Sequence, residues 1–298
     1  MEIERKNYKE IECLEESMLT GIYHILETLF PFSFMQYDFM KNSFLAILII
    51  TPLFGILGTM IVSNKMAFFS DALGHSAFTG IAVGVLLGIS NTDLSMIGFA
   101  ILFALVLNLI KRHQTVSTDT IISVFSSMSM AVGLVILSKN GQFSNYSSLL
   151  VGDILSITGK EIFLLLIIFC VTIIFWTCCF NALHAQSVSE SLARSRGIPV
   201  VLIENAFAVL LAVLVMLSVR WVGILIINAL LILPAASARN LASNMREYHR
   251  FSVVISLFSG IVGLVVSFYN STATGPAIVL VAAAVFFLSL GAKVVYRL

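Results

Sequence analysis

A succession of apolar runs, each about long enough to cross a bilayer, constrains this chain more than any other feature. A transmembrane helix needs roughly 20 predominantly apolar residues. Runs of this kind fall at 44–63, 70–90, 94–110, 118–138, 160–182, 201–219, 221–239, 250–269 and 274–293. Only 11% of the residues are charged, against about 25% in a soluble domain. We therefore expect an all-α polytopic transmembrane bundle of eight or nine spans, with eight if the run containing Pro234 does not cross.

The distribution of positive charge orients the expected spans. Lys and Arg favour cytoplasmic loops, and here they fall at every second connection, at 65, 111–112, 194–196, 239–250 and 293–297. The consistent arrangement is nine spans with the N-terminus outside. The semi-polar connection 139–159 is expected to be a partly re-entrant loop, and Arg220 and Trp221 to be an anchor at the outer interface. No basic face is large enough to follow a phosphate backbone, which argues against nucleic-acid binding.

The first 43 residues differ in kind from the rest. Residues 1–16 are rich in Glu and Lys, and 18–36 are moderately apolar but contain Glu27 and Pro31. The segment lacks the basic start, the apolar run and the small-residue cleavage site of a signal peptide. We expect 1–43 to be an accessory tail with room for an interfacial helix, and 44–298 to be one transmembrane domain.

An acid and a histidine lie in the second apolar run, within the stretch SDALGHS at 70–76. Four residues are a little over one helical turn, so Asp71, His75 and Thr79 are expected to form one polar line. Ionisable groups in hydrocarbon are costly and usually mark a substrate or ion pathway. A carboxylate and an imidazole together suit a divalent transition metal, and an incomplete ligand set would let the ion leave. The alternative is an Asp–His hydrogen bond that only holds helices together.

Two further features concern helix packing and bending. Gly80, Gly84 and Gly88 form a small-xxx-small pattern, which predicts close approach of a neighbouring helix. In the run 222–239, Pro234 predicts a kink or break, and Asn228 needs a partner on another helix. This run is either an ordinary kinked span or a helix that lines a passage.

One cytoplasmic connection carries helix signals of its own. Ser187 and Glu190 fit a capping box. Ala193 and Arg194 would continue that helix, and Gly197 would give it a left-handed end. A short helix at about 187–197 is something that a soluble partner can bind, or else it only stabilises the loop. Of the five histidines, only His75 is expected well inside a span.

Motifs for catalysis are missing from the sequence. It holds no G-x-x-x-x-G-K-[ST] loop for ATP phosphates and no H-E-x-x-H helix of a metalloprotease. We therefore expect no enzyme activity in this chain. Any ATP hydrolysis that accompanies its function must belong to a separate chain.

Several of these segments resemble the membrane permeases of bacterial zinc, manganese and iron ABC importers. SDALGHS at 70–76 is similar to the S-D-A-L-S-H-A signature of that family, and LLILPAASAR at 230–239 to its L-L-I-I-P-A-A-T-A-R segment. The segment 190–197 matches its cytoplasmic E-x-x-A-x-x-x-G pattern, and Asp119 matches an acid before its fourth span. The resemblance runs from about residue 37 to the C-terminus.

The resemblance implies a multi-pass permease of the bacterial cell membrane that imports zinc, manganese or iron by alternating access. It implies a second permease copy, a cytoplasmic ATP-binding subunit and an extracytoplasmic metal-binding protein as partners, with the metal as cargo and no permanent cofactor. The implied roles are metal binding for Asp71 and His75; pathway or gating for Thr79, Asn228, Pro234 and Ser237; ATPase coupling for Glu190, Ala193, Arg194 and Gly197; and helix packing for Gly80, Gly84 and Gly88. The alternative is a proton-coupled secondary metal transporter in which Asp71 and His75 relay protons.

Overall fold

The computed structural model describes residues 21, 23, 33–89, 91–113, 117–139, 141 and 143–296. Most of the expected accessory tail lies outside these residues, and its role stays a prediction. The first long helix begins at Asp38. No strand occurs among the described residues, as the apolar runs predict.

Nine long helices make up the bundle in the part of the chain that the structure describes. They are α2 (Asp38–Ser63), α3 (Ala67–Leu87), α4 (Thr92–His113), α5 (Thr118–Lys139), α7 (Gly159–Val188), α9 (Val200–Val222), α10 (Ile224–Leu241), α11 (Met245–Asn270) and α12 (Thr274–Tyr296). Eight of these are long and apolar enough to cross a membrane, and α10 is a shorter apolar helix. The expected all-α polytopic bundle is confirmed, and each of the nine apolar runs forms one helix.

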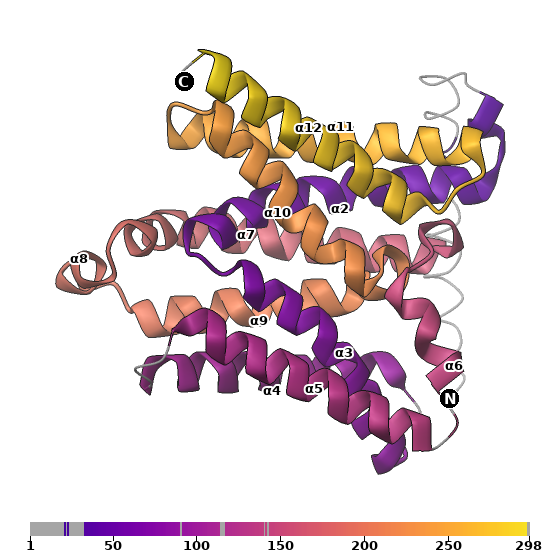
Figure 1. Cartoon of the computed structure of the whole chain (residues 1–298), viewed down its shortest axis with the longest axis horizontal. Coiled ribbons are helices and arrows are strands. Elements are labelled where there is room, and N and C mark those ends of the chain that lie inside the picture. Colours follow the sequence, from indigo (N-terminus) through magenta and orange to yellow (C-terminus); the bar gives the residue numbers. More distant parts are fainter. Residues whose placement is uncertain are drawn as a thin grey trace.

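The helices are arranged around α2, α9 and α10 (Figure 1). In this view α11 and α12 lie along one side of the bundle, and α4 and α5 lie along the other. α2 packs against α11, α10 and α7, whereas α3 packs against α4 and α5 and also touches α9 and α10. α3 therefore joins the α4–α5 side of the bundle to its centre.

Glycines bring the backbone of α3 close to two neighbours. A Cβ at Gly80 would lie 2.9 Å from Cα of Met96 on α4, and one at Gly84 would lie 2.7 Å from Cβ of Ser95. Gly133 of α5 does the same from the other side, although no sequence pattern pointed to it. Gly88 departs from the expected ladder, because it is the left-handed residue, with φ of 68°, that ends α3.

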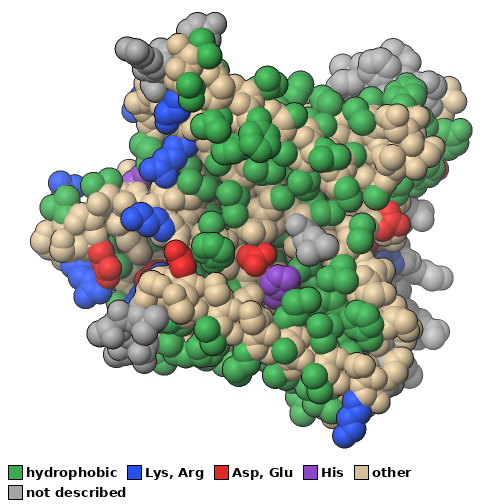
Figure 2. Space-filling model, in the orientation of Figure 1, with side chains coloured by type: hydrophobic (Ala, Val, Ile, Leu, Met, Phe, Trp, Pro, Cys, Tyr) green, Lys and Arg blue, Asp and Glu red, His purple; other side chains and the backbone are tan. Residues whose placement is uncertain are grey.

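The positively charged connections meet at one end of the bundle, as the charge pattern predicts. Lys65, Lys111, Arg112 and Arg194 line one cavity there. Figure 2 shows most Lys and Arg side chains of this face at the end where the short helix α8 projects in Figure 1. By the positive-inside rule this is the cytoplasmic end.

The opposite, outer end is closed by the connection between α5 and α7. It consists of α6 (Phe143–Tyr146), η2 (Ser147–Leu150) and η3 (Ile154–Ser156). These short turns contact α2, α9, α10 and α12. The expected partly re-entrant loop is thus a series of helical turns that packs back onto the bundle.

Two residues expected at the outer interface behave differently from each other. Arg220 forms ion pairs at 3.2 Å with Asp93 and at 3.8 Å with Glu161. Trp221 is only 4% exposed, so its expected role as an interfacial anchor is wrong. The reason is tertiary, because η2 and η3 cover the end of α9 where Trp221 lies.

A test of the close packing at the centre uses Gly58 of α2. A Cβ at Gly58 would overlap the carbonyl oxygen of Leu231 on α10. Gly58→Ala is expected to lower the melting temperature of the detergent-solubilised protein, because overpacking costs about 1–3 kcal/mol. Gly98→Ala on α4 is the control, since no atom lies within 4 Å of a Cβ there. Equal melting temperatures for the two variants would contradict the packing described here.

Candidate functional site

Asp71 and His75 face each other on α3, one turn apart. Nε2 of His75 lies 3.5 Å from Oδ2 of Asp71. The side chain of Asp71 is 38% exposed and that of His75 is 19% exposed, so neither is sealed inside the bundle. Nδ1 of His75 is buried and has no hydrogen-bond partner in the part of the chain that the structure describes. The acid and the imidazole are therefore partly exposed, with the second ring nitrogen turned into the bundle.

The surroundings of the pair are apolar. Figure 2 shows an acidic side chain and a histidine side by side near the middle of this face, where α3 runs in Figure 1. Phe68, on the same helix, is 52% exposed. Among the described residues, no three His, Cys, Asp or Glu side chains come together as a metal-ligand group. Asp71 and His75 are two candidate ligands, which would be half of a tetrahedral set.

Asn228 of α10 holds the acid of the pair in place. Its Nδ2 donates to Oδ1 of Asp71 at 3.5 Å, and its Oδ1 accepts from the hydroxyl of Ser70 at 2.7 Å. The expected partner of Asn228 on another helix is thus Ser70 together with Asp71. Because a second helix orients the carboxylate, a movement of α10 against α3 would change its position.

Two other residues expected along a pathway make structural contacts. Thr79 is 4% exposed, and its hydroxyl hydrogen-bonds to the backbone oxygen and the hydroxyl of Ser129 on α5. It ties α3 to α5 and does not continue the polar line of Asp71 and His75. Ser237 is buried and donates to the carbonyl oxygen of Leu233 at 2.7 Å.

Of the kink or break expected at Pro234, the break does not occur. Helix α10 continues through this residue from Ile224 to Leu241. The break lies eleven positions earlier in the chain, at Gly223, where φ is 88° between α9 and α10. The backbones of Gly223 and Gly152 touch there, and a Cβ on either residue would overlap the backbone of the opposite segment. Proline in a helix can be tolerated where packing holds the flanking turns, whereas a positive φ requires glycine.

The short cytoplasmic helix forms with a different cap from the expected one. Helix α8 spans Glu190–Ser195, and its N-cap is Ser189, whose hydroxyl accepts from the backbone N–H of Leu192. The capping box at Ser187 is wrong, because α7 runs on to Val188 and the Ser187 hydroxyl donates within that helix, to the carbonyl of His184.

The other residues of this segment lie where the sequence predicts. Glu190 forms an ion pair with Arg194 on the exposed side of α8, and Ala193 is fully buried. Gly197 has φ of 73° and follows the end of the helix. The same residue, Ser189, ends α7 and begins α8, so no linker separates the two helices.

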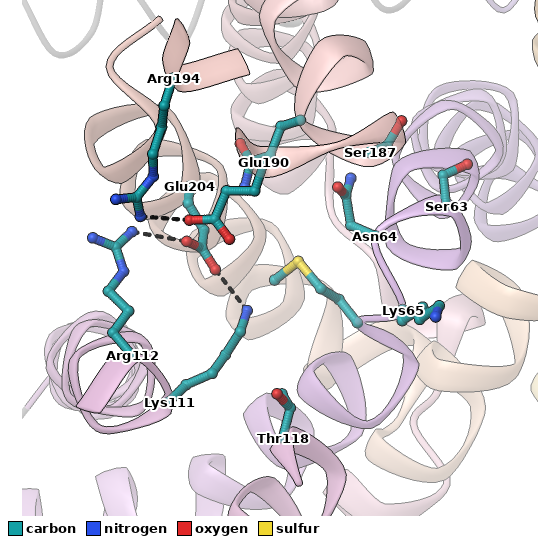
Figure 3. Close-up of a pocket in the computed structure, with 12 residues that line it drawn as sticks. Ser63, Asn64, Lys65, Lys111, Arg112, Thr118, Ser187, Glu190, Arg194 and Glu204 are labelled. Carbon is teal, nitrogen blue, oxygen red and sulfur yellow. Dashed lines mark hydrogen bonds and ion pairs between the residues drawn. The ribbon is translucent and has the colours of Figure 1, made fainter. Parts of the chain in front are cut away.

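A polar cavity of about 550 Å³ lies beside α8 at the cytoplasmic end. Figure 3 shows Lys111 and Arg112 of α4 pointing toward Glu204 of α9, with the Glu190–Arg194 pair next to them. Glu204 is 8% exposed and accepts from Lys111 at 2.6 Å and from Arg112 at 2.8 Å. An acid inside the apolar run 201–219 signals that a partner is needed, but the sequence does not say which base supplies it.

Comparisons with known proteins agree on one family. The family described as the ABC 3 transport family matches residues 36–293. The high-affinity zinc uptake system membrane protein ZnuB of Haemophilus influenzae is 32% identical over 242 residues, which cover 78% of this chain and 90% of that protein. The manganese transport system membrane protein MntC of Listeria monocytogenes is 25% identical over 261 residues, covering 88% and 93%.

A solved structure has the same fold. The match is to PsaBC from Streptococcus pneumoniae in complex with Fab, with a TM-score of 0.75 and 24% sequence identity. It covers 91% of this chain and 95% of that chain.

The buried ion pairs of Glu204 give a stability test. Glu204→Ala leaves Lys111 and Arg112 without their acid, and we expect a loss of about 1–3 kcal/mol, since both bases retain some solvent contact. Glu190→Ala removes an exposed pair and is expected to cost less than about 1 kcal/mol. Thermal unfolding of both variants in detergent measures the difference. A larger loss for Glu190→Ala would contradict this assignment.

Proposed function

Since the chain belongs to the ABC 3 transport family, we propose that it is the permease subunit of an ATP-driven importer for a divalent transition metal ion. The observation that carries the proposal is the partly exposed Asp71–His75 pair on α3. Carboxylate and imidazole serve zinc, manganese and iron, and relatives named for zinc and manganese support this class of cargo. The metal is the substrate, and the chain holds no permanent cofactor.

The metal in transit lies between two copies of the chain. Each copy contributes Asp71 and His75, and a twofold dimer would place two carboxylates and two imidazoles around one ion. The exposure of the pair supports this arrangement, because a site completed within one chain would be enclosed by that chain. Ligands supplied by two bodies can also separate, which releases the ion.

Movement of α10 against α3 would switch the site between the two sides of the membrane. Asn228 touches Asp71, and Pro234 and Ser237 lie further along the same helix. Rocking of helices around a fixed site is a common route to alternating access. At the outer end an extracytoplasmic binding protein delivers the metal, and the membrane is the bacterial cell membrane.

ATP hydrolysis takes place on a separate cytoplasmic subunit that contacts α8. Two apolar side chains next to the Glu190–Arg194 pair support this contact: Val188 is 77% exposed and Leu192 is 45% exposed. They lie at the cytoplasmic end, where no lipid would cover them. A partner that buries them would push directly on α7, because α7 and α8 share Ser189.

The ligand role predicts a transport defect for changes that remove the donor atoms. Asp71→Asn keeps the shape of the side chain but removes its charge, and His75→Gln replaces the imidazole with a neutral amide, so metal uptake is expected to fall roughly 10-fold or more. Zinc and manganese uptake is measured in cells lacking the native permease, at equal membrane abundance. Asp38→Asn, at an acid that is 81% exposed at the start of α2, is the control and should transport normally. Normal uptake by both Asp71→Asn and His75→Gln would refute the ligand role.

The contact with the ATPase predicts a different defect. Leu192→Glu places a charge on the apolar surface of α8 and is expected to abolish co-purification with the ATPase subunit. Ser195→Glu, on the same helix and also exposed, should leave it intact. If Leu192→Glu still co-purifies, α8 is not the contact. If the unchanged chain binds no ATPase but still transports, the proton-coupled carrier replaces the importer.

A further inference from the structure

Two histidines outside the pathway site meet near the cytoplasmic end of the bundle. His184 lies one turn before the end of α7, and His249 lies one turn after the start of α11. Their Nε2 atoms are 3.0 Å apart, and both side chains are half-buried. Both lie near helix ends, so they agree with the expectation that only His75 lies well inside a span.

A threonine of α2 fixes which nitrogen of His249 carries the proton. Oγ1 of Thr59 lies 2.6 Å from the carbonyl oxygen of Ile56 and 2.7 Å from Nδ1 of His249. A hydroxyl has one proton, which goes to the Ile56 carbonyl, so Thr59 must accept from Nδ1–H of His249. The lone pair of His249 is then on Nε2 and points at His184. Metal-bound histidines show this arrangement, with the other ring nitrogen donating to an oxygen.

We propose that His184 and His249 form a second metal site, on the cytoplasmic side, for a divalent transition metal of the same class as the cargo. Two nitrogens bound tetrahedrally to zinc at about 2.0–2.1 Å lie about 3.3 Å apart. The observed 3.0 Å separation is that of a hydrogen bond in which Nε2–H of His184 donates to His249. The ion would replace that proton, which His184 releases or carries on Nδ1 instead, and the two nitrogens would move apart by a few tenths of an ångström. The two rings come from different helices, so the ion would join α7 to α11.

Aromatic rings surround the histidine pair. The rings of Trp176 and Phe180 pack edge-on against the pair, with centroids 5.2 Å from His249 and 4.5 Å from His184. A cavity of about 330 Å³ lies at the same end of the bundle and is lined by Val188 and Tyr248, near the two histidines in sequence, although neither histidine lines it. Water would complete the coordination of the ion.

The position of the site gives it a regulatory role. His184 lies five residues before Ser189. Ser189 both ends α7 and begins α8, so no linker separates the two helices. A metal ion between His184 and His249 would hold the cytoplasmic end of α7 against α11, and α8 would no longer move freely with the ATPase. Metal that accumulates in the cytoplasm would thus slow its own import. This regulatory step rests on the proposed import function, whereas metal binding by the pair does not.

Metal binding is tested on the purified permease–ATPase complex carrying Asp71→Ala and His75→Ala, which removes the pathway ligands. Equilibrium dialysis with Zn²⁺ is expected to leave one bound ion per permease chain, and adding His184→Gln with His249→Gln should remove it. Thr59→Val keeps both ligands and should weaken binding roughly 10-fold. With Co²⁺, the absorption bands of nitrogen ligation should disappear in the glutamine variants. Equal Zn²⁺ binding with and without the two histidines would overturn the site.

The regulatory role is tested in proteoliposomes that contain the complex with the ATPase side facing a lumen loaded with ATP and Zn²⁺, and with the metal-loaded extracytoplasmic binding protein outside. The ratio of uptake with and without this Zn²⁺ is compared within each protein. We expect the unchanged complex to lose most of its uptake and the His184→Gln, His249→Gln complex to lose much less. Equal losses would overturn the regulatory role. Absence of uptake under every condition would refute the import function and leave the dialysis result standing.

Discussion

A carboxylate and an imidazole within a bilayer must face protein, water or a cation, because hydrocarbon offers them no hydrogen bonds. The arrangement of α3 follows from this requirement. Gly80 lets α3 press against α4, Gly133 lets α5 press against α3, and Asn228 reaches Asp71 from α10. With these sides occupied, the open side of α3 is the one that carries Asp71 and His75. The pair contacts Asn228 and is partly exposed, which fits the proposed role as a transient metal site.

The cytoplasmic end holds two polar connections between helices. Glu204 ties α4 to α9 through two bases, and His184 ties α7 to α11 through His249. Helix α8 lies next to the first connection and continues directly from α7. A force applied to α8 therefore reaches α7 first and can reach the helices around α3 through packed polar contacts. Tying two transmembrane helices together at this end is also the simplest way to restrain that motion.

The incorrect local predictions have one cause. In each case, contacts with other parts of the chain outweighed a local sequence preference. Ser187 and Glu190 have capping-box spacing, but α7 continues past Ser187 and Ser189 becomes the cap. Tryptophan is a residue type typical of interfacial anchors, but the connection between α5 and α7 buries Trp221. Pro234 remains within a helix that its neighbours hold together, so the chain bends at Gly223.

The sequence by itself determined the number and order of the helices, the end of the bundle where positive charge gathers, and the placement of an acid and a histidine one turn apart. These properties depend on local periodicity and composition, which do not require knowledge of neighbouring helices. Only the tertiary structure decided that Asn228 meets Asp71, that Glu204 meets Lys111, and that His184 meets His249. These contacts join residues 65 to 157 positions apart. The physical reason is that the choice of neighbour is made by side-chain packing between helices, and no repeat along one helix encodes it.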